Sequence, residues 1–186
     1  MDENLRTESQ IKQAVSIISA LVAEAQRIEE DTLYSSKNHF EEARKWNNRH
    51  LWIGIPTTII AVLAGVTAIK DYLTISAILS FCVAANTALF TFLNPKERAT
   101  LHLKAGNAYN ALRNDARIFR EIDCLQEKST TELSKRLNDL HAQRSALNAD
   151  SPQPSQDFFY LARKGIESGE ANYAVDNQNK NTKIND

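Results

Sequence analysis

The sequence predicts an all-α membrane protein: a two-helix transmembrane hairpin with long cytoplasmic helices before and after it. Three observations lead to this class: two long runs without charged residues, a very short polar connection between them, and helical periodicity on both sides. The average composition conceals this class, because the mean hydropathy of −0.41 is that of a hydrophilic chain. The apolar residues are concentrated in the middle, where a sliding window finds them.

The two central runs are long enough to cross a bilayer. Residues 51–69 and residues 72–93 contain no Asp, Glu, Lys or Arg. At about 1.5 Å per residue, the first run is roughly 28 Å long as a helix, close to the roughly 30 Å hydrocarbon core. The alternative, burial in a soluble core, would require a shell of apolar partners that the charged flanks do not supply. A cleaved signal peptide is disfavoured, because the first run begins only after fifty residues and a second run follows at once.

The connection between the runs is the dipeptide Lys70-Asp71, and the charges around the runs predict the orientation. Lys70 suits the negative end of the first helix, and Asp71 is a favourable N-cap for the second. On the other side, seven basic residues flank the runs: Lys37, Arg44, Lys45 and Arg49 before them, and Lys96, Arg98 and Lys104 after them. Because cytoplasmic flanks carry the excess of Lys and Arg, both termini are expected in the cytoplasm.

Residues 1–50 are expected to form an N-terminal cytoplasmic helical segment. Thr7 and Gln10 have the spacing of a capping box, and apolar residues then recur at three- and four-residue steps. The polar residues 34–38 are expected to be a weak point, after which a second stretch leads into the membrane. Amphipathic aromatic residues, which prefer membrane interfaces, lie near the expected boundaries: Trp46, Trp52 and Tyr72.

Residues 94–150 form the second expected cytoplasmic helical segment. In its first helix, residues 95–122, apolar side chains follow alternating four- and three-residue steps, which is the spacing of a helix-helix seam. Ser129 and Glu132 have the spacing of another capping box, which starts a helix with a leucine stripe. The contacts expected for these helices involve Leu101, Ala108, Leu112, Phe119, Leu133, Leu137 and Leu140. Packing within one chain and packing between subunits are both compatible with this spacing.

Residues 151–170 are expected to be a linker followed by a short helix, and residues 171–186 a disordered tail. Pro152 and Pro154 oppose helix formation and favour an extended chain. From Asp176 onward the only apolar residue is Ile184, so this stretch is too polar to fold alone.

Motifs for catalysis, cofactor binding or metal binding are not found, so we expect neither an enzyme nor a cofactor. The four histidines are scattered without zinc-site spacing. Cys82 lies in an apolar run and Cys124 in a flanking helix, which leaves no disulfide framework and no Cys-x-x-Cys site. The formal charge of −1 predicts no direct binding of nucleic acid.

Polar residues of the second run gather on one helical face, within roughly 60° of one another at about 100° per residue: Ser76, Ser80, Thr87, Thr91 and Asn94. Asn86 lies near the expected bilayer midplane, where its amide requires a hydrogen-bond partner or water. In the structural interpretation, the hydroxyls bond to carbonyls four residues back and pack against the first run. In the functional interpretation, several copies assemble so that these residues line a narrow aqueous path.

Small residues of the first run have the four-residue spacing that allows helices to approach closely: Ala61, Ala64, Gly65 and Ala68. That face is therefore expected to contact another transmembrane helix. Two helices cannot enclose a pore, so the functional interpretation of the polar stripe requires a homo-oligomer.

Several features follow one another in a particular order: a cytoplasmic helix, His39-Phe40-x-x-Ala43 with Trp46, then His50-Leu-Trp-Ile-Gly-Ile-Pro56, the two-residue turn, and the helix over 95–122. Pro56 fits the first turns of the first transmembrane helix. Over residues 8–170 this order resembles the SLATT family, the SMODS and SLOG-associating two-transmembrane effector domains of bacteria. The resemblance implies a pore-forming or membrane-disrupting effector of the inner membrane in a bacterial anti-phage or conflict system. It also implies a separately encoded sensor: a nucleotide cyclase, a SLOG-type sensor or a reverse transcriptase.

The leading hypothesis is thus a defence effector that oligomerises in the lipid bilayer and permeabilises it when a cytoplasmic sensor partner or nucleotide signal triggers it. The alternative is a non-conducting membrane scaffold whose helices recruit a cytoplasmic partner. Ion flux distinguishes the two hypotheses. A membrane-bound enzyme would need catalytic residues that the sequence does not show.

Overall fold

The computed structural model describes residues 2–126 and 128–155, together with residues 164 and 168. Over these residues the chain is helical and contains no strand, which confirms the predicted all-α class. The elements are α1 (Asp2–Ile69), α2 (Leu73–Leu93), α3 (Pro95–Glu121), the short 3-10 helix η1 (Asp123–Leu125) and α4 (Thr130–Asp150). The expected short C-terminal helix and tail lie outside the described residues.

The chain divides into two compact units. The first, which we call the bundle unit, is formed by Met1–His39 and Ala105–Asp186. The second, the paired-helix unit, is Phe40–Lys104. Both α1 and α3 therefore contribute residues to each unit.

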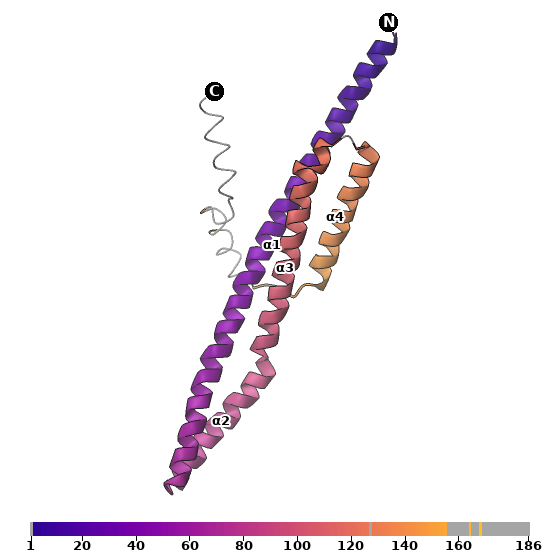
Figure 1. The fold of residues 1–186 in the computed structure, drawn as a ribbon. Helices are drawn as coiled ribbons and strands as arrows, with labels where there is room; N and C mark the ends of the chain where they lie inside the picture. The colour runs from indigo at the N-terminus through magenta and orange to yellow at the C-terminus, as the bar shows by residue number, and fades with distance from the viewer. Residues whose placement is uncertain (1, 127, 156–163, 165–167, 169–186) are drawn as a thin grey trace, which may run out of the picture. The chain divides into compact units, whose positions relative to one another are not determined.

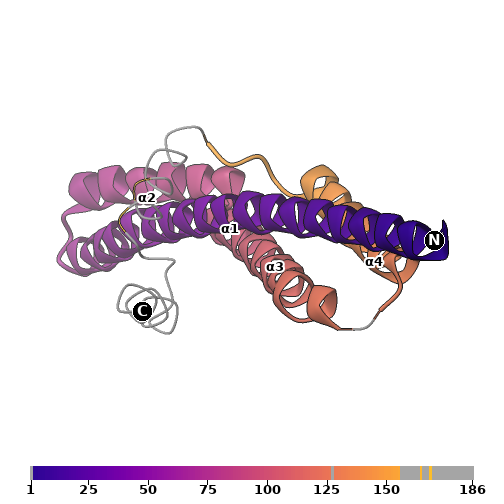
Figure 2. The same cartoon turned by 90° about the horizontal axis from the view of Figure 1, so that it is seen from above.

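In the bundle unit, the first part of α1 lies beside α3 and α4 (Figures 1 and 2). Their buried side chains form one apolar core: Leu21, Ala25, Ile28, Leu112, Ala116, Phe119, Cys124, Leu133, Leu137 and Leu140. Burying each large side chain of this kind contributes about 1.5–3 kcal/mol. Of the contacts expected from the sequence, Leu112, Phe119 and the three leucines of α4 thus pack within the chain.

The buried seam of α3 differs in part from the predicted one. It consists of Ala105, Tyr109, Leu112, Ala116 and Phe119, at alternating four- and three-residue steps. Leu101 is 45% exposed and Ala108 is only half-buried, so neither lies at its centre. Tyr109 takes the place expected for Ala108, because its ring buries more apolar area and its hydroxyl has a hydrogen-bond partner inside the unit.

Helix α1 continues through the residues where the sequence predicts a weak point. Residues 34–38 are helical, and the helix begins at Asp2, so Thr7 is not its N-cap. Thr32 and Ser36 are buried in this region, and their hydroxyls donate to backbone carbonyls of the same helix at 2.6 and 2.9 Å. Because these polar groups are satisfied locally, they do not interrupt the helix.

Pro56 lies inside α1 rather than in the first turns of a separate helix, which corrects the expectation from the sequence. Proline has no amide hydrogen, so the Trp52 carbonyl lacks its usual helical donor. The next two residues, Thr57 and Thr58, donate their hydroxyls to carbonyls four residues back at 2.7 and 2.9 Å. Such hydroxyls help helices in apolar surroundings to tolerate a proline.

The turn between α1 and α2 contains residues 70–72, one more than predicted. Asp71 has a positive φ of 58°, and the Tyr72 amide donates to the Thr67 carbonyl at 3.0 Å. This hydrogen bond and the left-handed residue form a Schellman-type ending of α1. The prediction of Asp71 as the N-cap of the second helix is therefore wrong. Tyr72 precedes α2 instead, without a side-chain cap.

Helix α2 lies beside the last part of α1 (Figures 1 and 2). Near the turn, the Ser76 hydroxyl donates to the Ala64 carbonyl at 3.1 Å. Near the other end of α2, the rings of His50 and Phe90 lie with their centroids 5.1 Å apart. The two apolar helices are thus in contact at both ends of α2.

Helix α2 ends at a residue with left-handed backbone geometry. Asn94 has a φ of 40°, and its amide donates to the Phe90 carbonyl at 3.0 Å. Asn tolerates this conformation better than most residues. Pro95 follows and begins α3, because proline fits the first turn of a helix.

The apolar stretches of α1 and α2 expose their side chains. The most apolar 18-residue windows of both helices have a mean hydropathy of 1.9, and they are 6% and 0% buried. Within the described residues, these are two helices long and apolar enough to cross a membrane. A core helix of a soluble protein would be mostly buried, whereas these windows are exposed.

Candidate functional site

The predicted pore-lining residues of α2 differ in their exposure. Ser76 and Asn86 are half-buried. The other predicted pore-lining residues are exposed: Ser80, Thr87, Thr91 and Asn94. The structure therefore separates the predicted set into a half-buried group and an exposed group.

The half-buried group belongs to the side of α2 that packs on α1. Half-buried residues recur along α2 at three- and four-residue steps: Ser76, Leu79, Val83, Asn86, Phe90 and Leu93. Ser76 and Phe90 in this row contact α1 directly. Asn86 therefore places its amide on the packed side of α2. Grouping residues by polarity missed this row, whereas its three- and four-residue spacing is visible in the sequence.

The hydroxyl groups of α2 differ in their hydrogen bonds. Ser76 bonds across to α1, and Thr91 donates to the Thr87 carbonyl four residues back at 2.9 Å, as the structural interpretation expects. Among the described residues, the side chains of Ser80, Asn86 and Thr87 have no hydrogen-bond partner. Within the described part of the chain, these three polar groups therefore remain unsatisfied, on a helix with a strongly apolar surface.

The small residues of α1 also divide between two environments. Ala64 is 7% exposed, where the Ser76 hydroxyl reaches its carbonyl. Ala61, Gly65 and Ala68 are exposed, and a Cβ added at Gly65 would meet nothing within 4 Å. The contact between α1 and α2 thus uses Ala64 and leaves the other three as an open face of small residues. Contact of that open face with another transmembrane helix stays a prediction.

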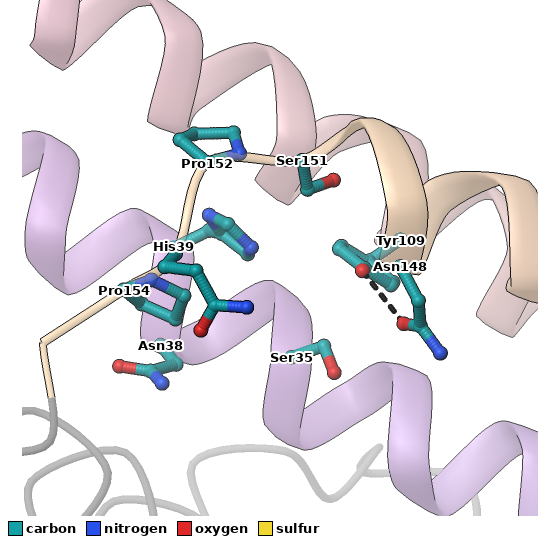
Figure 3. Close-up of a pocket in the computed structure, with 9 residues that line it drawn as sticks. Ser35, Asn38, His39, Tyr109, Asn148, Ser151, Pro152 and Pro154 are labelled. Carbon is teal, nitrogen blue, oxygen red and sulfur yellow. Dashed lines mark hydrogen bonds between the residues drawn. The ribbon is translucent and has the colours of Figure 1, made fainter.

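The bundle unit contains a polar pocket of about 240 Å³ (Figure 3). The rings of His39 and Tyr109 stack there, with centroids 5.4 Å apart and planes at 18°. The Tyr109 hydroxyl donates to Asn148 Oδ1 at 2.9 Å. The pocket is lined by three helices and by the chain that follows α4: Ser35, Asn38, His39, Tyr109, Asn148, Ser151, Pro152, Gln153 and Pro154.

The chemistry of this pocket suits a small, uncharged ligand. The Oδ1 atom of Asn38 is buried, and it has no hydrogen-bond partner among the described residues. Among the described residues that line the pocket, none is Lys, Arg, Asp or Glu. These described residues therefore offer amide groups and stacked rings, without a Lys or Arg that would bind a phosphate. Sequence reasoning missed the pocket because the polar residues 34–38, taken as a helix weak point, contribute to its wall.

Burial shifts two ionisable groups in opposite directions. It lowers the pKa of His102 below the ordinary 6.5, and although Glu42 opposes this shift, Arg98 adds to it. Burial raises the pKa of the Cys124 thiol above the ordinary 9.0. At neutral pH the structure thus favours a neutral imidazole and a protonated, unreactive thiol.

Among the residues that the structure describes, no three His, Cys, Asp or Glu side chains are grouped so that they could hold a metal ion. Comparison of the chain with protein-family models, with curated proteins and with solved structures finds no match.

Proposed function

We propose that this protein is a membrane effector that assembles into oligomers and permeabilises the bilayer when it is triggered. In this proposal, residues 51–69 and Leu73–Leu93 cross the membrane as a hairpin. The main support is the set of unsatisfied polar groups on α2, the hydroxyls of Ser80 and Thr87 and the amide of Asn86. Hydrocarbon offers them no hydrogen bonds, so they require water or a neighbouring subunit.

The charge distribution supports an orientation with both termini in the cytoplasm. Seven basic residues flank the apolar helices on the side of the termini, and Lys70 alone lies in the turn. The positive-inside tendency places the richer side in the cytoplasm. The resemblance to SLATT effectors makes the bacterial inner membrane the proposed location and anti-phage defence the proposed context.

The trigger in this proposal is a separately encoded cytoplasmic sensor. The resemblance favours a nucleotide cyclase, a SLOG-type sensor or a reverse transcriptase as that partner. The described residues that line the polar pocket include no Lys or Arg for the phosphates of a nucleotide. This composition favours a partner protein over direct reading of a nucleotide in that pocket.

A non-conducting scaffold is the second candidate, and two hydrogen bonds favour it. Ser76 is satisfied by the Ala64 carbonyl, and Thr91 by the Thr87 carbonyl. Such internal bonds are sufficient for hydroxyls that only pack in a membrane. A scaffold would recruit a cytoplasmic partner through its helices without any ion flux.

Replacing both exposed, unsatisfied hydroxyls tests the proposal. The double variant Ser80→Leu with Thr87→Leu should insert normally, because leucine is favourable in a membrane helix. It should also lose conduction, because a hydrophobic constriction is a barrier to hydrated ions. The measurement is membrane depolarisation, followed with a voltage-sensitive dye in bacteria that express the protein at high level together with its neighbouring genes.

The matched control is Ile78→Leu, which alters an exposed apolar residue of the same helix without changing polarity. It should depolarise cells as the parent does, at an equal amount of protein in the membrane. If the parent leaves the membrane potential intact, or if the double leucine variant depolarises cells as readily, permeabilisation through this face is refuted and the scaffold is preferred.

A further inference from the structure

The paired-helix unit carries an excess of positive charge beside its apolar helices. Phe40–Lys104 contains seven Lys and Arg against four Asp and Glu, although the whole chain has a formal charge of −1. Apart from Lys70, these basic residues all precede Leu51 or follow Leu93. The positive charge of the unit is therefore concentrated at one end of the apolar pair.

Two of these cations contact the same aromatic ring. The guanidinium carbon of Arg49 lies 4.5 Å from the ring centroid of Trp46, and that of Arg98 lies 4.9 Å from it. Arg98 also donates its Nε hydrogen to the carbonyl of Leu93, the last residue of α2, at 3.0 Å. The Trp46 ring is half-buried. Residues from α1 and α3 and the end of α2 thus fix two guanidiniums around one indole.

Neither guanidinium has a carboxylate partner within the described chain. The nearby carboxylates are engaged elsewhere, because Glu41 pairs with Arg44 and Glu97 accepts a hydrogen bond from Asn94. Two like charges held on one ring repel each other, so a negative ligand is favoured there. The planar fork of arginine matches the oxygens of a phosphate group.

The depth of Arg49 and Arg98 in the membrane follows from the proposed transmembrane hairpin, so the inference rests on the proposed function. Arg49 lies two residues before Leu51, and Arg98 lies five residues after Leu93. At about 1.5 Å per residue, both lie within roughly 8 Å of the hydrocarbon edge. The polar headgroup layer of a bilayer is about 5–8 Å thick on each side. The two arginines are therefore at the level of lipid phosphates.

We propose that Trp46, Arg49 and Arg98 form a binding site for the phosphate of an anionic phospholipid, of the phosphatidylglycerol or cardiolipin class. The phosphate oxygens accept hydrogen bonds from both guanidiniums, and the indole lies at the headgroup level that tryptophan prefers. A lipid bound there neutralises the repulsion between the arginines. It also stabilises the junction of α1, α3 and the end of α2 at the membrane surface.

The test compares lipid binding by the purified full-length protein in mild detergent. The double variant Arg49→Gln with Arg98→Gln is compared with a second double variant, Lys96→Gln with Lys104→Gln. The lysine variant also loses two positive charges, but from residues of α3 outside the site. Native mass spectrometry measures the binding of dioleoyl phosphatidylglycerol relative to dioleoyl phosphatidylcholine. The parent and the lysine variant should prefer phosphatidylglycerol by about tenfold, and the arginine variant should lose this preference.

A second variant separates geometry from charge. Arg49→Lys with Arg98→Lys keeps both charges but lacks the planar forks, so it should retain only part of the preference for phosphatidylglycerol. The proposed site is refuted if the arginine-to-glutamine variant keeps the full preference, or if the lysine-to-glutamine control loses it equally. Either result would mean that anionic lipid is attracted by the overall positive charge of the unit. Thermal stabilisation by inorganic phosphate alone, equal to that by the lipid, would indicate a site for soluble anions and overturn the proposal.

Membrane flotation of the same variants separates this inference from the proposed function. Protein that fails to float with lipid vesicles would disprove both the transmembrane hairpin and the lipid site. Protein that floats and depolarises cells but shows no preference for phosphatidylglycerol would disprove the lipid site alone.

Discussion

At the scale of single residues, the burial of His102 makes the stability of the fold depend on pH. Its side chain is 5% exposed, and burial lowers its pKa below 6.5 in the folded protein. The unfolded chain binds protons at the ordinary value, so it takes up more protons as the pH falls below about 6.5. The free energy of unfolding should therefore decrease from that pH down to the folded pKa, and be insensitive to this group above it.

The substitution His102→Gln should remove this part of the acid sensitivity, because glutamine does not titrate. Thermal unfolding of the detergent-solubilised protein at several pH values between about 5 and 8 measures the effect. The parent should lose more stability than the variant across this range. Equal losses would show that other groups dominate the response.

Single residues also show where sequence reasoning reaches its limit. Ser129 was predicted as a cap and is one, because a capping box is a local pattern that the chain satisfies within four residues. Asp71 was predicted as a cap and instead closes α1, because two competing local patterns meet in one short turn. Tyr109 was not predicted in the seam, because its burial depends on the partners that α1 and α4 supply.

At the scale of elements, the start of α4 provides a measurable test. The Ser129 hydroxyl accepts a hydrogen bond from the Glu132 amide at 3.2 Å, and the Glu132 carboxylate accepts one from the Ser129 amide at 3.2 Å. Ser129→Ala removes the first bond and should cost about 1 kcal/mol in the free energy of unfolding. Chemical denaturation followed by circular dichroism measures this cost.

Thr131→Ala is the control, since Thr131 is exposed in the same helical turn and does not cap it. It should change the free energy of unfolding by less than about 0.5 kcal/mol. If Ser129→Ala is as stable as Thr131→Ala, the first turn of α4 frays without destabilising the core around Leu133.

The helices themselves could be predicted from the sequence to different degrees. The apolar runs and the leucine stripe of α4 follow from periodicity alone, since hydrophobic spacing reports which face is buried. The continuity of α1 could not be predicted, because residues 34–38 are polar enough to suggest a break. In the structure the Ser36 hydroxyl, like that of nearby Thr32, donates to a carbonyl of the same helix. The polar residues of α2 differ in exposure because α1 covers one side of the helix. A helical wheel of α2 alone does not include that neighbour.

At the scale of the whole molecule, the proposed orientation can be tested with engineered cysteines. A thiol reagent that cannot cross membranes should label Lys70→Cys in intact cells, and label Lys104→Cys only after permeabilisation. The native thiols interfere little, because burial raises the pKa of Cys124 and Cys82 lies within the apolar helix α2. Labelling of Lys104→Cys in intact cells would reverse the proposed orientation.

In the proposed orientation, the turn at residues 70–72 is the part of the hairpin that reaches the outer side of the membrane. Three residues span about 10 Å at most. A segment of that length exposes too little surface for an antibody, a protease or a phage receptor-binding protein to bind. In the proposed orientation, the cell would display almost nothing of this protein to an attacker. A phage outside the cell would therefore have almost no exposed surface of this protein to bind or inactivate before the phage genome entered the cell.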